Sequence, residues 1–215
     1  MNETKDIETI LNKVAQKVEG KGAPVNDFER LQTTEPFRVL VATILSARTK
    51  DEVTSAAVKR LFSKIKGPKD LEKLSPEELE RLIYPVGFFR NKARFLAALP
   101  RALEAFGSKI PDNLQDLLKI PGVGRKTANL VLSRAFGKKA ICVDTHVHRI
   151  MNMWGFVKTR TPEETERALE KILPKGWWSR INPVLVAFGQ TICKPVAPRC
   201  KKCPVKRECP KFKSL

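Results

Sequence analysis

The sequence predicts an all-α protein. Apolar residues recur at the spacing of a single helix face along most of the 215-residue chain. Runs that alternate between apolar and polar residues, the signature of strands, are nearly absent. Proline, glycine or a capping residue stands at most boundaries between the apolar segments. We therefore expect many short to medium helices and no internal repeat.

The first half of the chain begins with a strongly amphipathic helix over residues 7–18. Pro36 suits the first position of a helix that continues through Leu45, because the N–H that proline lacks would have no partner inside the helix there. A third helix is expected over 51–65, and two short helices are expected to begin at Pro68 and at Pro76. The last helix expected in this half runs over 91–106 and ends at Gly107.

The centre of the chain predicts two helices joined by a tight hairpin. Residues 114–120 and 126–136 are apolar at helical spacing. Between them, Pro121 lacks an N–H, and Gly122 and Gly124 favour positive φ, so the helix cannot continue. The second helix therefore opens with backbone N–H groups that face outward and can bind an anion such as a DNA phosphate.

Lys126 lies in the first turn of that second helix. The helix dipole and the neighbouring Arg125 both disfavour a protonated amine at this position. An amine held in this way is a candidate nucleophile, which phosphate binding alone does not require. The alternative is a surface lysine that only contacts phosphate.

After the hairpin, three more helices are expected. A short apolar link over 140–143 leads to Asp144, which suits the N-cap of a helix over 145–154. Thr161, followed by proline and two glutamates, indicates another helix start. Residues 181–192 are apolar and form the last expected helix before a group of cysteines.

The charge of the chain indicates a polyanionic partner. It has 41 Lys and Arg against 23 Asp and Glu, a formal net charge of +18. A thermophile-type surface is rich in both signs and does not produce this imbalance, so nucleic acid is the first candidate. No apolar stretch is long enough to span a bilayer, and the start lacks a secretory apolar region. We expect no membrane association and a cytoplasmic, nucleoid-associated location.

Four late cysteines follow the spacing C-x6-C-x2-C-x5-C: Cys193, Cys200, Cys203 and Cys209. Thiolates gathered in so short a segment can hold one iron–sulfur cluster or one zinc ion. The spacing favours a [4Fe–4S] cluster modestly, because zinc sites more often contain two separated C-x2-C pairs. Cys142 stands apart and is interpreted as a buried core residue. From Cys193 to the end, eight basic residues accompany one glutamate, Glu208, and a metal-bound loop would direct such charges toward phosphates.

In this order, the hairpin lysine, the segment Val143-Asp144-Thr145-His146 and the cysteine spacing resemble the endonuclease III family of helix-hairpin-helix DNA glycosylases and AP lyases. Segments 36–47 and 87–93 also resemble that family, so the similarity covers nearly the whole chain. It implies two α-helical domains. One, over 28–139, is a six-helix barrel with the hairpin; the other joins 1–27 to 140–215 and carries the iron–sulfur cluster. DNA is expected to bind across the cleft between them.

The resemblance implies base excision repair chemistry at Lys126 and Asp144. Lys126 would attack C1′ of a nucleotide rotated out of the duplex, displace an oxidised pyrimidine such as thymine glycol and form a Schiff base. β-Elimination would then nick the strand. Asp144 would stabilise the positive charge that develops on the sugar and assist proton transfer. Its alternative role, a helix N-cap, is compatible with this one.

By the same resemblance, the residues expected to contact DNA are Arg48, Phe88, Gly122, Gly124, Arg125, Thr127 and His146. Arg48 replaces the glutamine with which the family fills the space left by the flipped base, which puts the opposite-base preference in doubt. Phe88 stands where an apolar wedge, commonly leucine, is found; a core aromatic is the alternative. For His146 the alternative is a structural histidine. Similar hairpins also hold a monovalent cation on their backbone carbonyls when DNA is bound.

Two other functions stay open at this point. One is a mismatch-type glycosylase acting on uracil, thymine or adenine, although such relatives usually lack the hairpin lysine. The other is a non-enzymatic iron–sulfur or zinc-containing DNA-binding protein that uses the hairpin only as a phosphate clamp. In each case the expected partner is double-stranded DNA, with damaged bases or abasic sites for the enzyme, and the expected state is a monomer.

Overall fold

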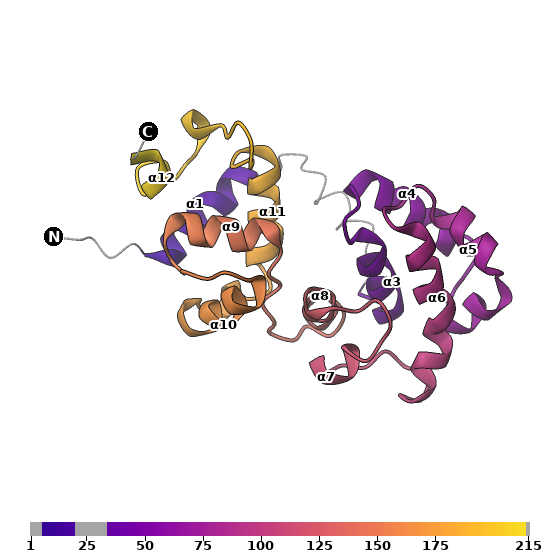
Figure 1. Cartoon of the computed structure of the whole chain (residues 1–215). Helices are drawn as coiled ribbons and strands as arrows, with labels where there is room; N and C mark the ends of the chain where they lie inside the picture. Colours follow the sequence, from indigo (N-terminus) through magenta and orange to yellow (C-terminus); the bar gives the residue numbers. More distant parts are fainter. Residues whose placement is uncertain (1–5, 20–33, 214–215) are drawn as a thin grey trace. The chain divides into compact units, whose positions relative to one another are not determined.

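The computed structural model describes residues 6–19 and 34–213, and it confirms the all-α prediction, since no strand occurs in these two segments (Figure 1). The α-helices are α1 (Ile7–Val18), α3 (Pro36–Ser46), α4 (Asp51–Phe62), α5 (Pro76–Ile83), α6 (Phe89–Glu104), α7 (Leu114–Leu117), α8 (Arg125–Ala135), α9 (Thr145–Trp154), α10 (Pro162–Ile172), α11 (Ile181–Thr191) and α12 (Pro210–Lys213). Three short 3-10 helices are η1 (Pro68–Lys73), η2 (Lys175–Trp177) and η3 (Cys200–Lys202).

Local capping explains why most helices begin where the sequence predicts. The Asp144 side chain caps α9, and the Thr161 side chain caps α10 with a proline in its first turn. Ser75 and Glu78 form a reciprocal capping box at the start of α5. The clearest difference is α7, which is one turn long instead of reaching residue 120. The proline that follows residue 120 disfavours helical backbone immediately before it.

The chain divides into two compact units, one within residues 27–138 and the other joining 1–26 to 139–215. The predicted boundary at residues 27–28 lies outside the described residues. Within the described part of the chain, no helix combines the length and the apolar character that crossing a bilayer requires.

The unit within 27–138 is built around α3. Eight of the eleven residues of α3 are buried, on every side of the helix, which is the pattern of a helix surrounded by protein. α3 packs against α4, α6 and α8, and α5 packs against α4 and α6. Helix α8, which follows the hairpin, is therefore fixed on the central helix of its unit.

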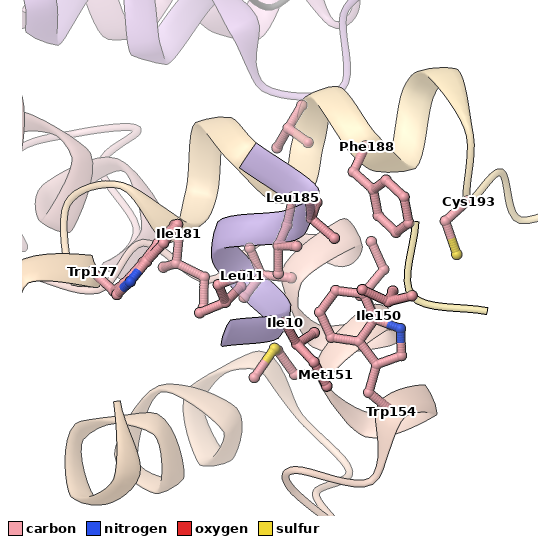
Figure 2. Close-up of a cluster of buried hydrophobic side chains, with 14 of the residues drawn as sticks. Ile10, Leu11, Ile150, Met151, Trp154, Trp177, Ile181, Leu185, Phe188 and Cys193 are labelled. Atoms are coloured by element: carbon pink, nitrogen blue, oxygen red, sulfur yellow. The ribbon is translucent and has the colours of Figure 1, made fainter. Parts of the chain in front are cut away.

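The other unit has a core formed by both ends of the chain. Leu11 and Val14 of α1 are fully buried among residues of α9 and α11, as Figure 2 shows for Leu11, Ile150 and Leu185. Trp154 and Trp177 are also buried in this core. An ion pair of 2.7 Å between Lys13 Nζ and Glu208 Oε1 joins α1 to the segment that carries the late cysteines.

Gly189 allows α11 to approach α9 closely, because a Cβ at this position would collide with the His146 ring. We predict that Gly189→Ala lowers the free energy of unfolding by about 1–2 kcal/mol. Overpacking costs about 1–3 kcal/mol, and the gain in helix propensity of about 1 kcal/mol offsets only part of it. Thermal unfolding measures the effect, at roughly 2–4 °C in Tm per kcal/mol.

The matched control is Gly176→Ala, where an added Cβ would meet nothing within 4 Å. We expect the Tm of this variant to stay near that of the unmodified protein. Equal Tm values for the two variants would contradict a close contact between α9 and α11.

Candidate active site and metal centre

The hairpin between α7 and α8 has the tight backbone that the sequence predicts. Gly122 has φ +79°, and a Cβ there would also collide with the Phe95 ring. The Val123 N–H donates to the Ile120 carbonyl over 3.1 Å, which closes the turn. Gly124 is the N-cap of α8 and supplies no side-chain hydrogen bond to the first N–H groups of the helix. The beginning of α8 can therefore donate backbone N–H groups to an anion.

The side chains in the first turn of α8 differ in their exposure to solvent. Thr127 is buried, with 8% of its surface exposed, whereas Lys126 is exposed and Arg125 is half-buried. Since Thr127 packs inward, the DNA contact predicted for it rests on its backbone. Lys126 lies in the accessible position that a nucleophile needs.

Asp144 is the N-cap of α9, so the structural alternative considered for it is confirmed. Its Oδ1 accepts hydrogen bonds from the N–H groups of His146 and Val147, each of 2.9 Å. Among the described residues none donates to Oδ2. The carboxylate is half-buried and is held in a fixed direction by the cap, which leaves one oxygen for another partner.

His146, the next candidate, is half-buried, and its ring lies against the backbone of α11 at Gly189. This packing supports the structural interpretation of His146. A contact between His146 and DNA stays a prediction.

Arg48 and Phe88 lie side by side, although they come from separate loops. The Arg48 guanidinium carbon is 5.6 Å from the centroid of the Phe88 ring, a cation–π distance. Both side chains are exposed, Phe88 to 58%, which excludes the core alternative for this phenylalanine. Both residues also have positive φ, 53° and 58°, a conformation that bulky side chains adopt only rarely.

The four late cysteines line one cavity of about 150 Å³. Cys193 follows α11 directly, Cys200 and Cys203 enclose η3, and Cys209 precedes α12. Cys193 and Cys209 are buried, and the other two are half-buried. Cys193 points away from α11 in Figure 2, beside the apolar core that includes Phe188. Cys142 is buried elsewhere, as predicted.

Burial raises the pKa of the Cys193 thiol, and a hydrogen bond from Arg149 opposes that rise. Burial and the neighbouring cysteines raise the pKa of Cys203 to about 11. A metal or a cluster would favour the thiolate form of both residues, because a positive centre offsets the desolvation that burial imposes on a thiolate.

Arg149 also lines the cysteine cavity, which the sequence did not reveal. Its guanidinium donates to the Cys193 carbonyl over 2.6 Å and lies 3.7 Å from Cys193 Sγ. The only feature of the sequence that could have indicated this role is that a charged residue interrupts the apolar pattern of 145–154. Such hydrogen bonds orient a metal-binding cysteine and stabilise its thiolate.

Basic side chains surround the cysteine segment, and five of them are exposed: Arg199, Lys201, Lys202, Arg207 and Lys211. The acidic residue of this segment, Glu208, is paired with Lys13. The segment consequently presents a positive surface of the kind that contacts phosphates.

The chain is similar to known DNA repair proteins. Residues 41–175 match the family described as HhH-GPD superfamily base excision DNA repair protein. The chain is 53% identical to Endonuclease III of Thermotoga maritima over 82% of its own length and 83% of that protein. It is 42% identical, over 94% of its length, to Endonuclease III homolog 1, chloroplastic, of Arabidopsis thaliana, of which it spans 58%.

A solved structure of a trapped endonuclease III–DNA covalent intermediate, in an estranged-adenine complex, superimposes with a TM-score of 0.87. The sequences are 37% identical, and the superposition covers 97% of this chain and 96% of the other.

Proposed function

Because the chain belongs to the endonuclease III family of HhH-GPD base excision DNA repair proteins, we propose that Lys126 and Asp144 carry out its reaction on damaged double-stranded DNA. The protein is a base excision repair DNA glycosylase and AP lyase. Its proposed substrates are oxidised pyrimidines such as thymine glycol and the abasic sites that their removal leaves.

In the proposed reaction, the neutral amine of Lys126 attacks C1′ of the extruded nucleotide. The bond between C1′ and the base breaks, and the base leaves with the bonding electrons and takes up a proton. Opening of the sugar ring then gives an iminium between Nζ and C1′. The iminium acidifies the C2′ hydrogens, so loss of a C2′ proton expels the 3′ phosphate and nicks the strand.

Asp144 is the proposed carboxylate that faces the charge developing on the sugar. A carboxylate oxygen placed in advance stabilises an oxocarbenium-like or iminium centre without reorganisation during the reaction. The cap hydrogen bonds at Oδ1 keep Oδ2 available for this role. The same oxygen can accept and return protons as the ring opens.

The observation that carries the proposal is the exposed amine of Lys126 in the first turn of the hairpin helix. Phosphate binding by the hairpin requires only the backbone N–H groups of this turn. A covalent intermediate with DNA, as in the superimposed endonuclease III structure, requires a nucleophile.

Borohydride reduction on a duplex with an abasic site tests this function. We expect a covalent protein–DNA adduct that survives denaturing electrophoresis, because borohydride reduces the iminium to a stable amine. A mismatch glycosylase without lyase chemistry or a non-enzymatic DNA-binding protein would bind the same duplex and give no adduct. Absence of the adduct under conditions of complete binding would therefore contradict the proposal.

The proposed DNA contacts are the hairpin backbone at Gly122, Gly124 and Thr127, with Arg125 beside it, and the exposed pair of Arg48 and Phe88. In this proposal Phe88 enters the base stack, and Arg48 donates hydrogen bonds to the orphaned base. A monovalent cation on the hairpin carbonyls belongs to the same DNA-bound state. We further propose that the protein acts as a monomer in the cytoplasm, associated with the nucleoid.

The cofactor proposed for the cysteine cavity is a [4Fe–4S] cluster. A zinc ion draws all its thiolates to about 2.3 Å from one atom. Within the described residues, no three His, Cys, Asp or Glu side chains converge closely enough to hold a single ion. The four cysteines line one cavity of about 150 Å³, and their spacing along the chain favours a cluster over a zinc ion. When bound, such a cluster supplies the positive centre that the buried thiolates need.

We predict that Cys200→Ser lowers the content of iron and acid-labile sulfide and reduces the visible absorption of the purified protein, because one thiolate ligand is lost. The matched control is Cys142→Ala, which removes the buried cysteine outside the cavity and should keep the iron content unchanged. Zinc in the unmodified protein, with no visible absorption, would overturn the assignment.

A further inference from the structure

A buried lysine on α6 contacts the loop that carries Arg48. Only 5% of the surface of Lys92 is exposed. Its Nζ donates to the Leu45 carbonyl over 2.8 Å, to the Ala47 carbonyl over 2.5 Å and to the Thr49 hydroxyl over 3.1 Å. All three acceptors are neutral, and no carboxylate of the described residues pairs with this amine.

These acceptors lie where α3 ends and the Arg48 loop begins. The last carbonyls of a helix have no partner within the helix, and a cation near them is favourable. Burial lowers the pKa of Lys92 to about 8, so at pH 7 the amine is still mainly protonated and has three N–H donors for the three acceptors. An apolar side chain of the same length would leave the buried Leu45 carbonyl and the part-buried Ala47 carbonyl without this donor.

Two further hydrogen bonds connect this site to the loop that carries Phe88. The Lys92 backbone N–H donates to the Phe88 carbonyl over 3.1 Å. The Thr49 hydroxyl, which accepts from Lys92, also accepts from the Gly87 N–H over 3.1 Å. Gly87 has no room for a Cβ, because that atom would collide with the Arg48 carbonyl oxygen. The two loops are therefore in direct backbone contact around one amine.

Arg48 and Phe88 occupy left-handed backbone conformations, which are sterically unfavourable for L-residues with side chains. Such conformations persist only where the surrounding structure enforces them. The Lys92 side chain contributes to this enforcement, because its Nζ bonds Ala47 and Thr49, the residues on both sides of Arg48. Thr49 in turn accepts from the N–H of Gly87, which precedes Phe88.

We propose that Lys92 is a positioning residue that holds Arg48 and Phe88 in the arrangement in which they enter damaged duplex DNA. The inference rests on the proposed function, in which these two exposed side chains replace the extruded nucleotide. Lys92 does not touch the substrate, since its amine is buried and is bonded to three protein oxygens.

The test compares Lys92→Met with the unmodified protein on two substrates, an abasic site in duplex DNA and the same site in single-stranded DNA. Single-stranded DNA has no orphaned base and no stack to enter. We expect kcat/KM for strand nicking to fall about 10-fold or more on the duplex, because a small misplacement of positioning groups has effects of this size or larger. On the single strand we expect no more than about a two-fold change.

A double-mutant comparison separates positioning from general stability. If Lys92 acts through Arg48 and Phe88, adding Lys92→Met to the Arg48→Ala/Phe88→Ala variant causes little further loss on the duplex. A further loss by the same factor as in the otherwise unmodified protein would contradict the proposal.

The matched control is Arg101→Met, which removes one exposed charge from the same helix. We expect this variant to keep its activity on the duplex. A loss of activity in Arg101→Met equal to that in Lys92→Met would overturn the inference.

Should Lys92→Met not fold, Thr49→Val gives the second measurement. It removes the hydroxyl that joins Lys92 to Gly87 and keeps the amine, so a smaller selective loss on the duplex is expected. An equal loss on both substrates would contradict the inference for either variant. Failure of the proposed function is a separate result, because the unmodified protein would then nick neither substrate.

Discussion

Lys126→Gln is expected to abolish strand nicking and the borohydride adduct while the protein still binds damaged duplex DNA. Glutamine keeps the length and polarity of the side chain but cannot form an iminium. Loss of an essential nucleophile lowers kcat by roughly 10,000-fold or more. Gel-based nicking of an abasic duplex measures the rate, and fluorescence anisotropy measures binding.

The control for the lost charge is Lys109→Gln, which changes an exposed lysine of the same unit. Both variants should show a similar, small weakening of DNA binding, because each removes one positive charge. Only Lys126→Gln should lose the adduct. Retained lyase activity in Lys126→Gln would show that another amine is the nucleophile.

Asp144→Asn is expected to lower the rate of base removal about 100- to 10,000-fold, which corresponds to roughly 3–5 kcal/mol of barrier. Asparagine is as good an N-cap as aspartate, so its side-chain oxygen can accept the two hydrogen bonds that the structure shows at Oδ1. The substitution removes the negative charge and keeps the cap. We therefore expect a Tm close to that of the unmodified protein.

Asp144→Ala separates the two roles of this residue. It removes the charge and the cap together, so the same loss of rate should come with a further loss of about 1 kcal/mol in stability. Single-turnover kinetics and thermal unfolding measure the two effects independently. An unchanged rate in Asp144→Asn would leave only the structural role.

Features set by local rules were predictable from the sequence. The starts of α9 and α10 follow from Asp144 and Thr161, whose side chains bond the first N–H groups of their own helices. The hairpin follows from the proline and glycines between two apolar segments. The position of Lys126 in the first turn of α8 was predictable for the same reason, and its catalytic role stays a proposal.

Features set by contacts between distant residues were not predictable. Nothing in the basic pattern of α6 distinguishes Lys92 from its exposed neighbours, since its acceptors lie up to 47 residues earlier in the chain. Arg149 is likewise bonded to a cysteine 44 residues away. The positive φ values of Arg48 and Phe88 also escape local rules, which assign this conformation to glycine. These positions depend on how α3 and α6 pack together.

The two units differ in whether one continuous segment of the chain forms them, and this difference affects when each can fold during synthesis on the ribosome. The unit within 27–138 is one uninterrupted segment, whereas the other needs α1 and residues beyond 139. Domains fold as the chain emerges, so the hairpin-bearing unit can fold while the rest is still being translated. Helix α1 must wait for its partner α11, and the cysteine cavity, which residues up to Phe212 line, forms only after that segment has left the tunnel. The proposed cofactor can therefore be loaded only after this part of the chain has been translated.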